Sequence, residues 1–459
     1  MQEVQLADVG LPPLEVAETL PSIEAAEFEA RIAALLDAVN VDQVVVYGDR
    51  EHAANLIFLC NLDPRFEEAL LVLGRGRRTL ILGKEDIGYL PVVPIEVEAI
   101  LCPTLSLMGI DRAGGESVEG ALRAAGIRSG DRVGVVGWKA LLPGESSGSF
   151  SPIFAPAFIV DTLREICGQA ALVVDVTGAL MNARSGLRSF CSADQIAVFE
   201  YGASRCSAWV MEILRAAHPG VSERDAFRSV PWGGEPFSYH ATFASGADVA
   251  VGLRSATARR LELGDAAIAA IGLWGGNCAR GGLIAASESD LGAASEGYLE
   301  RFAIPYWRAM ASWYAALAVG VDGGELFAEI TGLLAGEVFG SSLNPGHLIH
   351  YDEWLDSPIR AGSDDPIASG MVLQSDIIPT GIRPGWTANC EDTVALGDGD
   401  LRAEIALRHP ELWARITARR SFLRDRLGIP VAEEVLPLSC TPAYFPPFWL
   451  SLDRAFIWG

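Results

Sequence analysis

Residues 264–282 read Gly-Asp-Ala-Ala-Ile-Ala-Ala-Ile-Gly-Leu-Trp-Gly-Gly-Asn-Cys-Ala-Arg-Gly-Gly. The first half is an apolar run of strand length, and the second half is a glycine-rich turn. Asp265 is the only carboxylate in the stretch, and Arg280 is the only basic residue. Alanine and glycine side chains offer no ligand atom to a metal ion, and an arginine repels a cation. We therefore expect these strands to contribute little to any metal site.

The composition indicates a folded protein of more than one domain. The chain has 459 residues, half of them hydrophobic, with 48 glycines and 25 prolines. This is enough for two or three domains around a large buried core. The net charge of −24 repels nucleic acid and anionic membranes, so we expect neither as a partner.

Targeting and cysteine patterns predict a soluble, cytoplasmic protein. Residues 1–21 are acidic and lack the basic start and apolar core of a signal peptide. The longest uncharged run, residues 435–452, contains four prolines and is not expected to cross a membrane. None of the eight cysteines belongs to a C-x-x-C pair, so we expect buried thiols in a reducing compartment.

Strand and helix patterns divide the chain near residue 188. Residues 1–188 begin with a helical pattern that Ser22 can cap, and helical patterns then alternate with apolar runs, which predicts an α/β domain. The expected strands are 43–47, 69–73, 79–82 and 133–136. Residues 189–459 open with the capping box Ser192-x-x-Gln195 and a long helical pattern. Helices followed by strand-like segments then occur twice, which predicts an α+β domain with a C-terminal tail.

Three further blocks follow the 264–282 stretch. They are Gly346-His347-Leu-Ile-His350, Gly370-Met-Val-Leu-Gln-Ser-Asp376 and Glu391-Asp-Thr-Val394. They resemble the Gly-His-Gly-Ile-Gly, Gly-Met-Val-x-x-x-Glu-Pro and Glu-Asp-Thr-Val blocks of the "pita-bread" family, which includes aminopeptidase P, prolidase, methionine aminopeptidase and creatinase. The resemblance covers about residues 190–395, and more weakly 40–140. It implies a creatinase-like α/β N-terminal domain (1–188), a pita-bread domain (189–459) and a homodimer.

The chain departs from the family's metal-binding pattern. The resemblance places Ala270 on the first metal-binding aspartate position and either Arg280 or Gly281 on the second. It places His347, Asp376 and Glu391 on the positions of the metal-binding histidine and glutamates. We therefore expect no dinuclear metal centre and no metal cofactor. The alternative is a single divalent metal at His347, Asp376 and Glu391.

Creatinase, the metal-free member, does not supply a mechanism either. Its catalytic histidine lies eight residues after the serine of a Ser-Gly pair, here Ser245-Gly246, and this position holds Leu253. Leucine cannot transfer a proton. His240 lies five residues before Ser245 and is a candidate proton shuttle, although a single histidine in an apolar strand is also typical of a core residue.

Three residues are candidates for substrate contacts. Arg280 can bind a substrate carboxylate, because a guanidinium turns a cation site into an anion site. Cys278 lies in the glycine-rich turn beside it and could act as a nucleophile if its pKa were lowered. Glu353 follows His347 where the family often has a substrate-contacting His-Glu pair; the alternative is a solvent-exposed loop acid.

These candidates support two classes of function. The first is a hydrolase that cleaves a C–N or amide bond of a small molecule or dipeptide without the usual metals. His347 and Glu391 would then do acid–base work while Asp376 orients the histidine. The second is a catalytically inactive pita-bread protein that binds a peptide or metabolite. We favour the hydrolase because three ligand-type side chains are retained.

Overall fold

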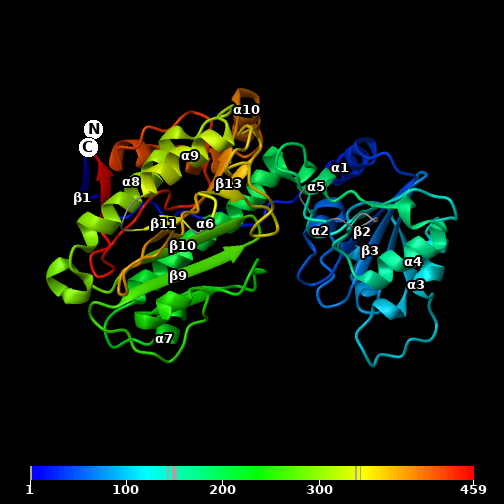
Figure 1. Ribbon diagram of the computed structural model, residues 1–459, viewed down its shortest axis with the longest axis horizontal. Helices are drawn as coiled ribbons and strands as arrows, with labels where there is room; N and C mark the ends of the chain where they lie inside the picture. Colours follow the sequence, from blue (N-terminus) through cyan, green and yellow to red (C-terminus); the bar gives the residue numbers. More distant parts are fainter. Residues whose placement is uncertain (1–2, 142–143, 147–151, 336–338, 342) are drawn as a thin grey trace. The chain divides into compact units, whose positions relative to one another are not determined.

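The computed structural model describes residues 3–141, 144–146, 152–335, 339–341 and 343–459, and it divides into two compact units. The N-terminal unit comprises residues 23–189, and the C-terminal unit comprises residues 1–22 together with 190–459. The sequence led us to expect residues 1–22 in the N-terminal domain. They join the other unit because β1 (Val4–Asp8) pairs in antiparallel fashion with the last strand, β18 (Arg454–Trp458) (Figure 1).

The N-terminal unit is built on a six-stranded sheet in the order β5-β4-β3-β2-β6-β7. The strands β2, β6 and β7 are parallel, as are β4 and β5, while the hairpin strand β3 runs antiparallel to its neighbours. The strands are β2 (Gln43–Gly48), β3 (Ala69–Gly74), β4 (Arg77–Leu82), β5 (Glu98–Leu101), β6 (Val133–Val136) and β7 (Val173–Asp175). The main helices are α1 (Ala25–Ala38), α2 (Ala54–Cys60), α3 (Val118–Ala124), α4 (Ala157–Cys167) and α5 (Gly178–Met181).

This arrangement confirms the α/β prediction. All four expected strands form, because each is an apolar run that is buried in the sheet. The expected cap at Ser22 is wrong. Helix α1 begins three residues later at Ala25, with Glu24 at its N-cap and no side-chain hydrogen bond there.

The C-terminal unit contains a first sheet in the order β15-β10-β9-β8. Its strands are β8 (Thr242–Ser245), β9 (Ala266–Leu273), β10 (Gly276–Leu283) and β15 (Asn389–Glu391). Helix α6 (Ala193–Ala216), capped by Ser192 as predicted, packs on one face of this sheet. A Cβ on Gly276 would lie 2.4 Å from the Ala203 backbone, so glycine allows the helix to sit directly on the hairpin.

A second sheet has the order β12-β13-β16-β17. Its strands are β12 (His347–Leu348), β13 (Val372–Gln374), β16 (Thr393–Leu396) and β17 (Val435–Pro437). The chain passes from the first sheet to the second at Asp392, the residue between β15 and β16. Glu391 is therefore the last residue of β15, and it immediately precedes Asp392, the residue that joins the two sheets.

The remaining helices follow a repeated plan. Helices α7 (Glu223–Phe227) and α9 (Gly323–Leu334) both follow a Gly-Val turn, and both are capped by the next side chain, Ser222 or Asp322. The others are α8 (Ile304–Ala316), α10 (Gly399–Arg408) and α11 (Pro410–Ser421), and β11 (Gly340–Ser341) pairs with β14 (Pro379–Thr380). The repeat supports the duplicated halves that the sequence suggested.

The C-terminal tail is folded into this unit and is not a free extension. Tyr444, Phe445, Phe448 and Trp449 are all buried. The Trp449 amide donates to the Leu283 carbonyl on β10. Within the described part of the chain, no helix combines the length and apolar character needed to cross a bilayer.

Candidate functional site

Four titratable side chains from separate segments meet in the C-terminal unit. His347 Nε2 lies 3.4 Å from Glu353 Oε1 and 4.0 Å from Asp376 Oδ2. One atom each of His347, Glu353 and Glu391 lie within 4.8 Å of one another. His347, Asp376 and Glu391 are buried, and the Glu353 side chain is 29% exposed. We call these four residues the acid cluster.

The imidazole of His347 has a fixed orientation. Its Nδ1 lies 3.2 Å from the Leu348 carbonyl oxygen, and because a carbonyl only accepts, Nδ1 carries the proton. Nε2 therefore faces the carboxylates and is free to gain or lose a proton. The indole of Trp354 stacks on the ring, with centroids 4.0 Å apart and planes 17° apart.

Glu391 is also held in place. The Asn277 side chain donates from Nδ2 to Glu391 Oε1 at 2.9 Å and accepts from the Tyr239 hydroxyl at 3.0 Å. Asn277 reaches Glu391 because β10 pairs with β15, with Ala279 directly opposite Glu391. The second carboxylate oxygen of Glu391 is left available to the cluster.

The buried carboxyls hold protons more tightly than usual. Burial raises the pKa of Asp376 to about 7, the Glu353 charge adds to this, and His347 opposes it. Burial raises the pKa of Glu391 well above its ordinary value, with further contributions from Asp376 and Glu353. Burial lowers the pKa of His347, but Glu353 and Asp376 outweigh it, so the net direction is upward. Asp376, with a pKa of about 7, can thus both give and take a proton near neutral pH.

The raised pKa of Asp376 gives a pH-dependent stability. The folded state binds this proton more tightly than the unfolded state, so the carboxyl destabilises the fold increasingly as pH rises from about 4 to about 7. We expect Asp376→Asn to raise the free energy of unfolding at pH 8 by on the order of 1–3 kcal/mol. Urea unfolding followed by tryptophan fluorescence would measure this. The gain should shrink toward pH 4, and an equal gain at both pH values would contradict this assignment.

The strands β9 and β10 bring no carboxylate to this face that could replace the missing aspartates. Ala270 pairs directly with Ala279, so these two side chains share a face with Gly281 and with Glu391. A Cβ on Gly281 would lie 2.7 Å from the Asn389 nitrogen, so no larger residue fits there. Two metal ions need several oxygen ligands between them. The residues present on these strands do not fit a dinuclear centre.

Arg280, a predicted substrate-binding residue, points away from the acid cluster. It pairs with Ala269 and Cys390, one residue out of step with Ala279, so it faces the opposite side of the sheet. Its side chain is fully buried and forms an ion pair with Asp392 at 2.6 Å. Its other donors reach the main-chain oxygens of Ala279, Glu391, Thr441 and Tyr444. With all donors used, Arg280 has none left for a substrate carboxylate.

Cys278 lies on the same far side as Arg280 and is fully buried. Burial raises the pKa of its thiol well above the ordinary value, and the charge of Arg280 only partly offsets this. The Arg280 guanidinium donates to its sulfur at 3.5 Å. A neutral, enclosed thiol is a poor nucleophile, so the structure does not place Cys278 among groups that could react.

The structure does not bring His240 into the acid cluster either. It is exposed, precedes β8, and lies with Nε2 3.3 Å from the Leu253 carbonyl oxygen. Leu253, at the position of the creatinase histidine, is 73% exposed. Among the described contacts of His240, none reaches His347, Glu353, Asp376 or Glu391.

Two residues that the sequence did not single out, Gln374 and Asn389, border the cluster. Gln374 is directly opposite His347 across the β12–β13 pair, and Asn389 shares the face of Glu391 two residues earlier on β15. Both are buried, and Gln374 Nε2 and Oε1 and Asn389 Oδ1 lack a hydrogen-bond partner in the described structure. Gln374 lies within the Gly-Met-Val block, and Asn389 lies two residues before the Glu-Asp-Thr-Val block. Their proximity to these blocks is the sequence feature that could have indicated both residues.

A single divalent metal has a different candidate ligand set from the expected one. The expected set was His347, Asp376 and Glu391. The three groups with ligand atoms close to one another are instead His347, Glu353 and Glu391. An imidazole and two carboxylates are a donor set that zinc, iron or manganese accepts. Glu353 is thus a member of the site and not only a loop acid.

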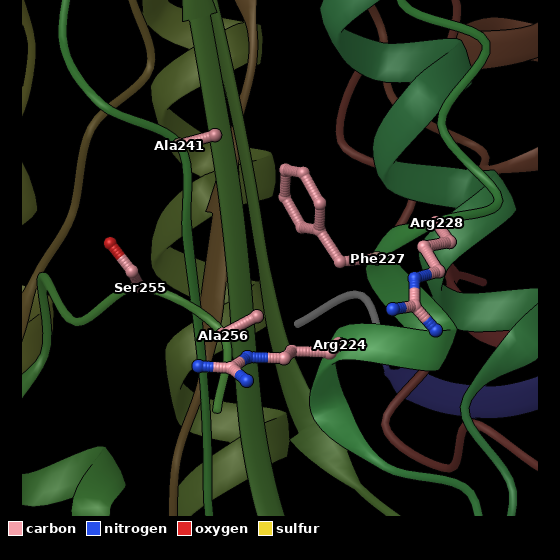
Figure 2. Close-up of a pocket in the computed structure, with 6 residues that line it drawn as sticks. All are labelled: Arg224, Phe227, Arg228, Ala241, Ser255 and Ala256. Atoms are coloured by element: carbon pink, nitrogen blue, oxygen red, sulfur yellow. The ribbon is translucent and has the colours of Figure 1, made fainter. Parts of the chain in front are cut away.

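A hollow of about 310 Å³ lies beside helix α7, away from the residues of the acid cluster. Figure 2 shows Phe227 and the guanidinium groups of Arg224 and Arg228 beside the small residues Ala241, Ser255 and Ala256. Arg228 forms an ion pair with Asp225. No carboxylate or imidazole lines this hollow among the described residues, so it offers no group for acid–base chemistry.

Comparisons with known proteins identify the fold. No family model and no curated protein matches the sequence. The structure is similar to an Xaa-Pro dipeptidase from Bacillus anthracis (TM-score 0.60, 15% identity, 82% of this chain and 96% of that chain). It is also similar to a prolidase from Pyrococcus horikoshii OT3 (0.61, 17%, 81% and 95%) and a dipeptidase from Mycobacterium ulcerans (0.58, 20%, 82% and 94%). The chain has the pita-bread fold of these enzymes, with an α/β N-terminal domain, as the sequence predicted.

Proposed function

We propose that this protein is a hydrolase that cleaves a C–N or amide bond of a small molecule or dipeptide without a dinuclear metal centre. The observation that carries this proposal is the acid cluster itself. A histidine and three carboxyls converge beside the strands β9 and β10, which contribute Ala270, Ala279 and Gly281 and no carboxylate on this face. The similarity to dipeptidases and prolidases supports the class of reaction through the fold alone.

The cluster contains the groups that such a reaction needs. In this proposal His347 Nε2, oriented by the Leu348 carbonyl, takes a proton from the attacking water while Glu353 stabilises the imidazolium. A protonated Asp376 then donates a proton to the departing nitrogen, which its pKa of about 7 allows near neutral pH; Glu391, whose pKa is also raised by burial, is the alternative donor. Water adds to the carbonyl carbon, the C–N bond breaks, and the products are an acid and an amine.

A test is a screen of dipeptides and small amides in which mass spectrometry detects both cleavage products. Glu391→Gln keeps the shape and the Asn277 contact but cannot transfer a proton, so we expect turnover to fall by at least about 100-fold. The melting temperature should stay near that of the wild type. Unchanged turnover in this variant would show that the reaction takes place at another site.

The rival function is an inactive protein that binds a peptide or metabolite. The specific observation in its favour is that neither aspartate position holds a carboxylate, with Ala270 on the first and Arg280 or Gly281 on the second, and that the creatinase histidine position holds the exposed Leu253. Ligands from a thermal-shift screen would then be recovered chemically intact, whereas a cleaved ligand would rule this function out.

The oligomeric state and the cellular location of the protein are predicted from the sequence alone. We propose a homodimer and a cytoplasmic location. All eight cysteines are buried as free thiols, which supports a reducing compartment.

A further inference from the structure

We propose that the hollow beside α7 is a binding site for a small aromatic anion, such as an aryl phosphate or an aryl carboxylate. Arg224 and Arg228 bind the charged group of this ligand, and Phe227 packs on its ring. The site goes beyond the proposed hydrolase, and binding to it can be measured without any turnover.

The hollow lies on the face of the first sheet opposite to the acid cluster. Thr242 of β8 pairs with Ala270, so it shares the face of Ala270 and of the cluster. Ser245, three residues further along β8, points to the other face, where its hydroxyl donates to Glu223 of α7 at 2.5 Å. The sheet therefore separates α7 and the hollow beside it from the acid cluster.

Three of the lining residues come from one side of α7. Arg224, Phe227 and Arg228 are spaced i, i+3 and i+4, and residues with this spacing are neighbours on a helix surface. Figure 2 shows Arg224 and Phe227 extending from α7 toward the segments that carry Ala256 and Ala241. Two guanidinium groups and an aromatic ring thus border a single space.

The two arginines have donors to offer to an anion. In the described part of the chain, Arg224 has no side-chain partner, and Arg228 pairs with Asp225 in an exposed ion pair. Residues 222–260 contain five arginines and four acidic residues, although the whole chain has a net charge of −24. A guanidinium presents its N–H groups as a planar fork that matches a phosphate or carboxylate group. The region is therefore suited to hold one anionic group.

A buried carboxylate ties the walls of the hollow together. Glu223 is 1% exposed and accepts hydrogen bonds from the Ser245 hydroxyl and from Thr257, whose amide lies at 2.8 Å and whose hydroxyl lies at 2.6 Å. The Arg224 amide donates to the Thr257 carbonyl. These bonds hold α7, β8 and the segment before Thr257 together, so a ligand does not have to order them when it binds.

The size and the lining of the hollow select the class of ligand. Its volume of about 310 Å³ is at the lower end of the range of small-molecule pockets, about 300–1,000 Å³. The ring of Phe227 and the methyl groups of Ala241 and Ala256 form an apolar wall beside the arginines. Inorganic phosphate would leave this wall unused, and the net charge of −24 repels a polyanion such as a nucleic acid. One aromatic ring with one anionic group uses both parts of the lining.

Isothermal titration calorimetry of the full-length protein with phenylphosphate is the direct test. The controls are inorganic phosphate, which lacks the ring, and benzyl alcohol, which lacks the charge. We expect phenylphosphate to bind with a dissociation constant in about the millimolar range and each control to bind at least about tenfold more weakly. No heat from phenylphosphate at such concentrations, or equal affinity for inorganic phosphate, would overturn the proposal.

A matched pair of variants locates the site. Arg224→Gln removes one exposed arginine from the hollow, and Arg123→Gln removes one exposed arginine from α3, where it pairs with Glu119. We expect the first to weaken phenylphosphate at least about tenfold and the second to leave its affinity unchanged. Equal weakening would mean that phenylphosphate senses only the net charge of the chain, which would overturn the proposal.

A third variant, Ala256→Leu, fills the hollow without changing any charge. We expect it to weaken phenylphosphate at least about tenfold, because the larger side chain takes the place of the ring. A melting temperature near that of the wild type would show that each variant is folded. Unchanged affinity in folded Ala256→Leu would place the ligand outside the hollow and overturn the proposal.

Discussion

Replacing Arg280 by methionine is expected to lower the free energy of unfolding of the C-terminal unit by about 3–5 kcal/mol, the cost of leaving a buried charge without its partner. Asp392, fully buried, would lose the guanidinium that lies 2.6 Å away. Four main-chain carbonyls, those of Ala279, Glu391, Thr441 and Tyr444, would lose a donor as well. Urea unfolding would show the loss, because ten of the eleven tryptophans lie in this unit.

Two controls distinguish this role from a general effect of removing a cation. Arg228→Met breaks an exposed ion pair with Asp225 on α7 and is expected to cost less than about 1 kcal/mol. The double variant Arg280→Met, Asp392→Leu removes both buried charges and should be more stable than Arg280→Met alone. A cost for Arg280→Met as small as that for Arg228→Met would contradict the structural role.

Replacing His347 by alanine should reduce turnover of any substrate found by about 100- to 10,000-fold, the contribution of a positioned acid–base group. The loss follows from the geometry, because the imidazole Nε2 lies 3.4 Å from Glu353 Oε1 and 4.0 Å from Asp376 Oδ2. Steady-state kinetics over a range of pH would show this as a lower kcat.

His347→Gln is the matched control for that substitution. It retains a polar side chain under Trp354 but cannot carry a proton at neutral pH, so it should lose as much turnover as alanine. Both variants should melt close to the wild type if folding is intact. Turnover near the wild-type rate in His347→Gln would show that the histidine only fills space.

The fold was largely predictable from local sequence. The apolar runs of the N-terminal sheet and the capping box at Ser192 act through neighbouring residues, so the pattern contains the signal. The three blocks around His347, Asp376 and Glu391 also identified residues that the structure brings together.

The parts that could not be predicted depend on register and on long-range pairing. A shift of one residue in β10 decides whether Arg280 or Ala279 faces Glu391, and the sequence leaves that register open. Residues 1–22 join the C-terminal unit only because β1 finds β18 at the other end of the chain. Glu353 belongs to the cluster through its approach to His347, which a loop sequence does not reveal.

We propose that the pita-bread site of this protein works without a dinuclear metal centre. Elemental analysis after incubation with Mn²⁺, Co²⁺ and Zn²⁺ and exhaustive dialysis tests it most directly. We expect no stoichiometric transition metal per chain, because Ala270, Ala279 and Gly281 supply no ligand atoms. Retention of about two metal ions per chain, lost in His347→Ala, would contradict it.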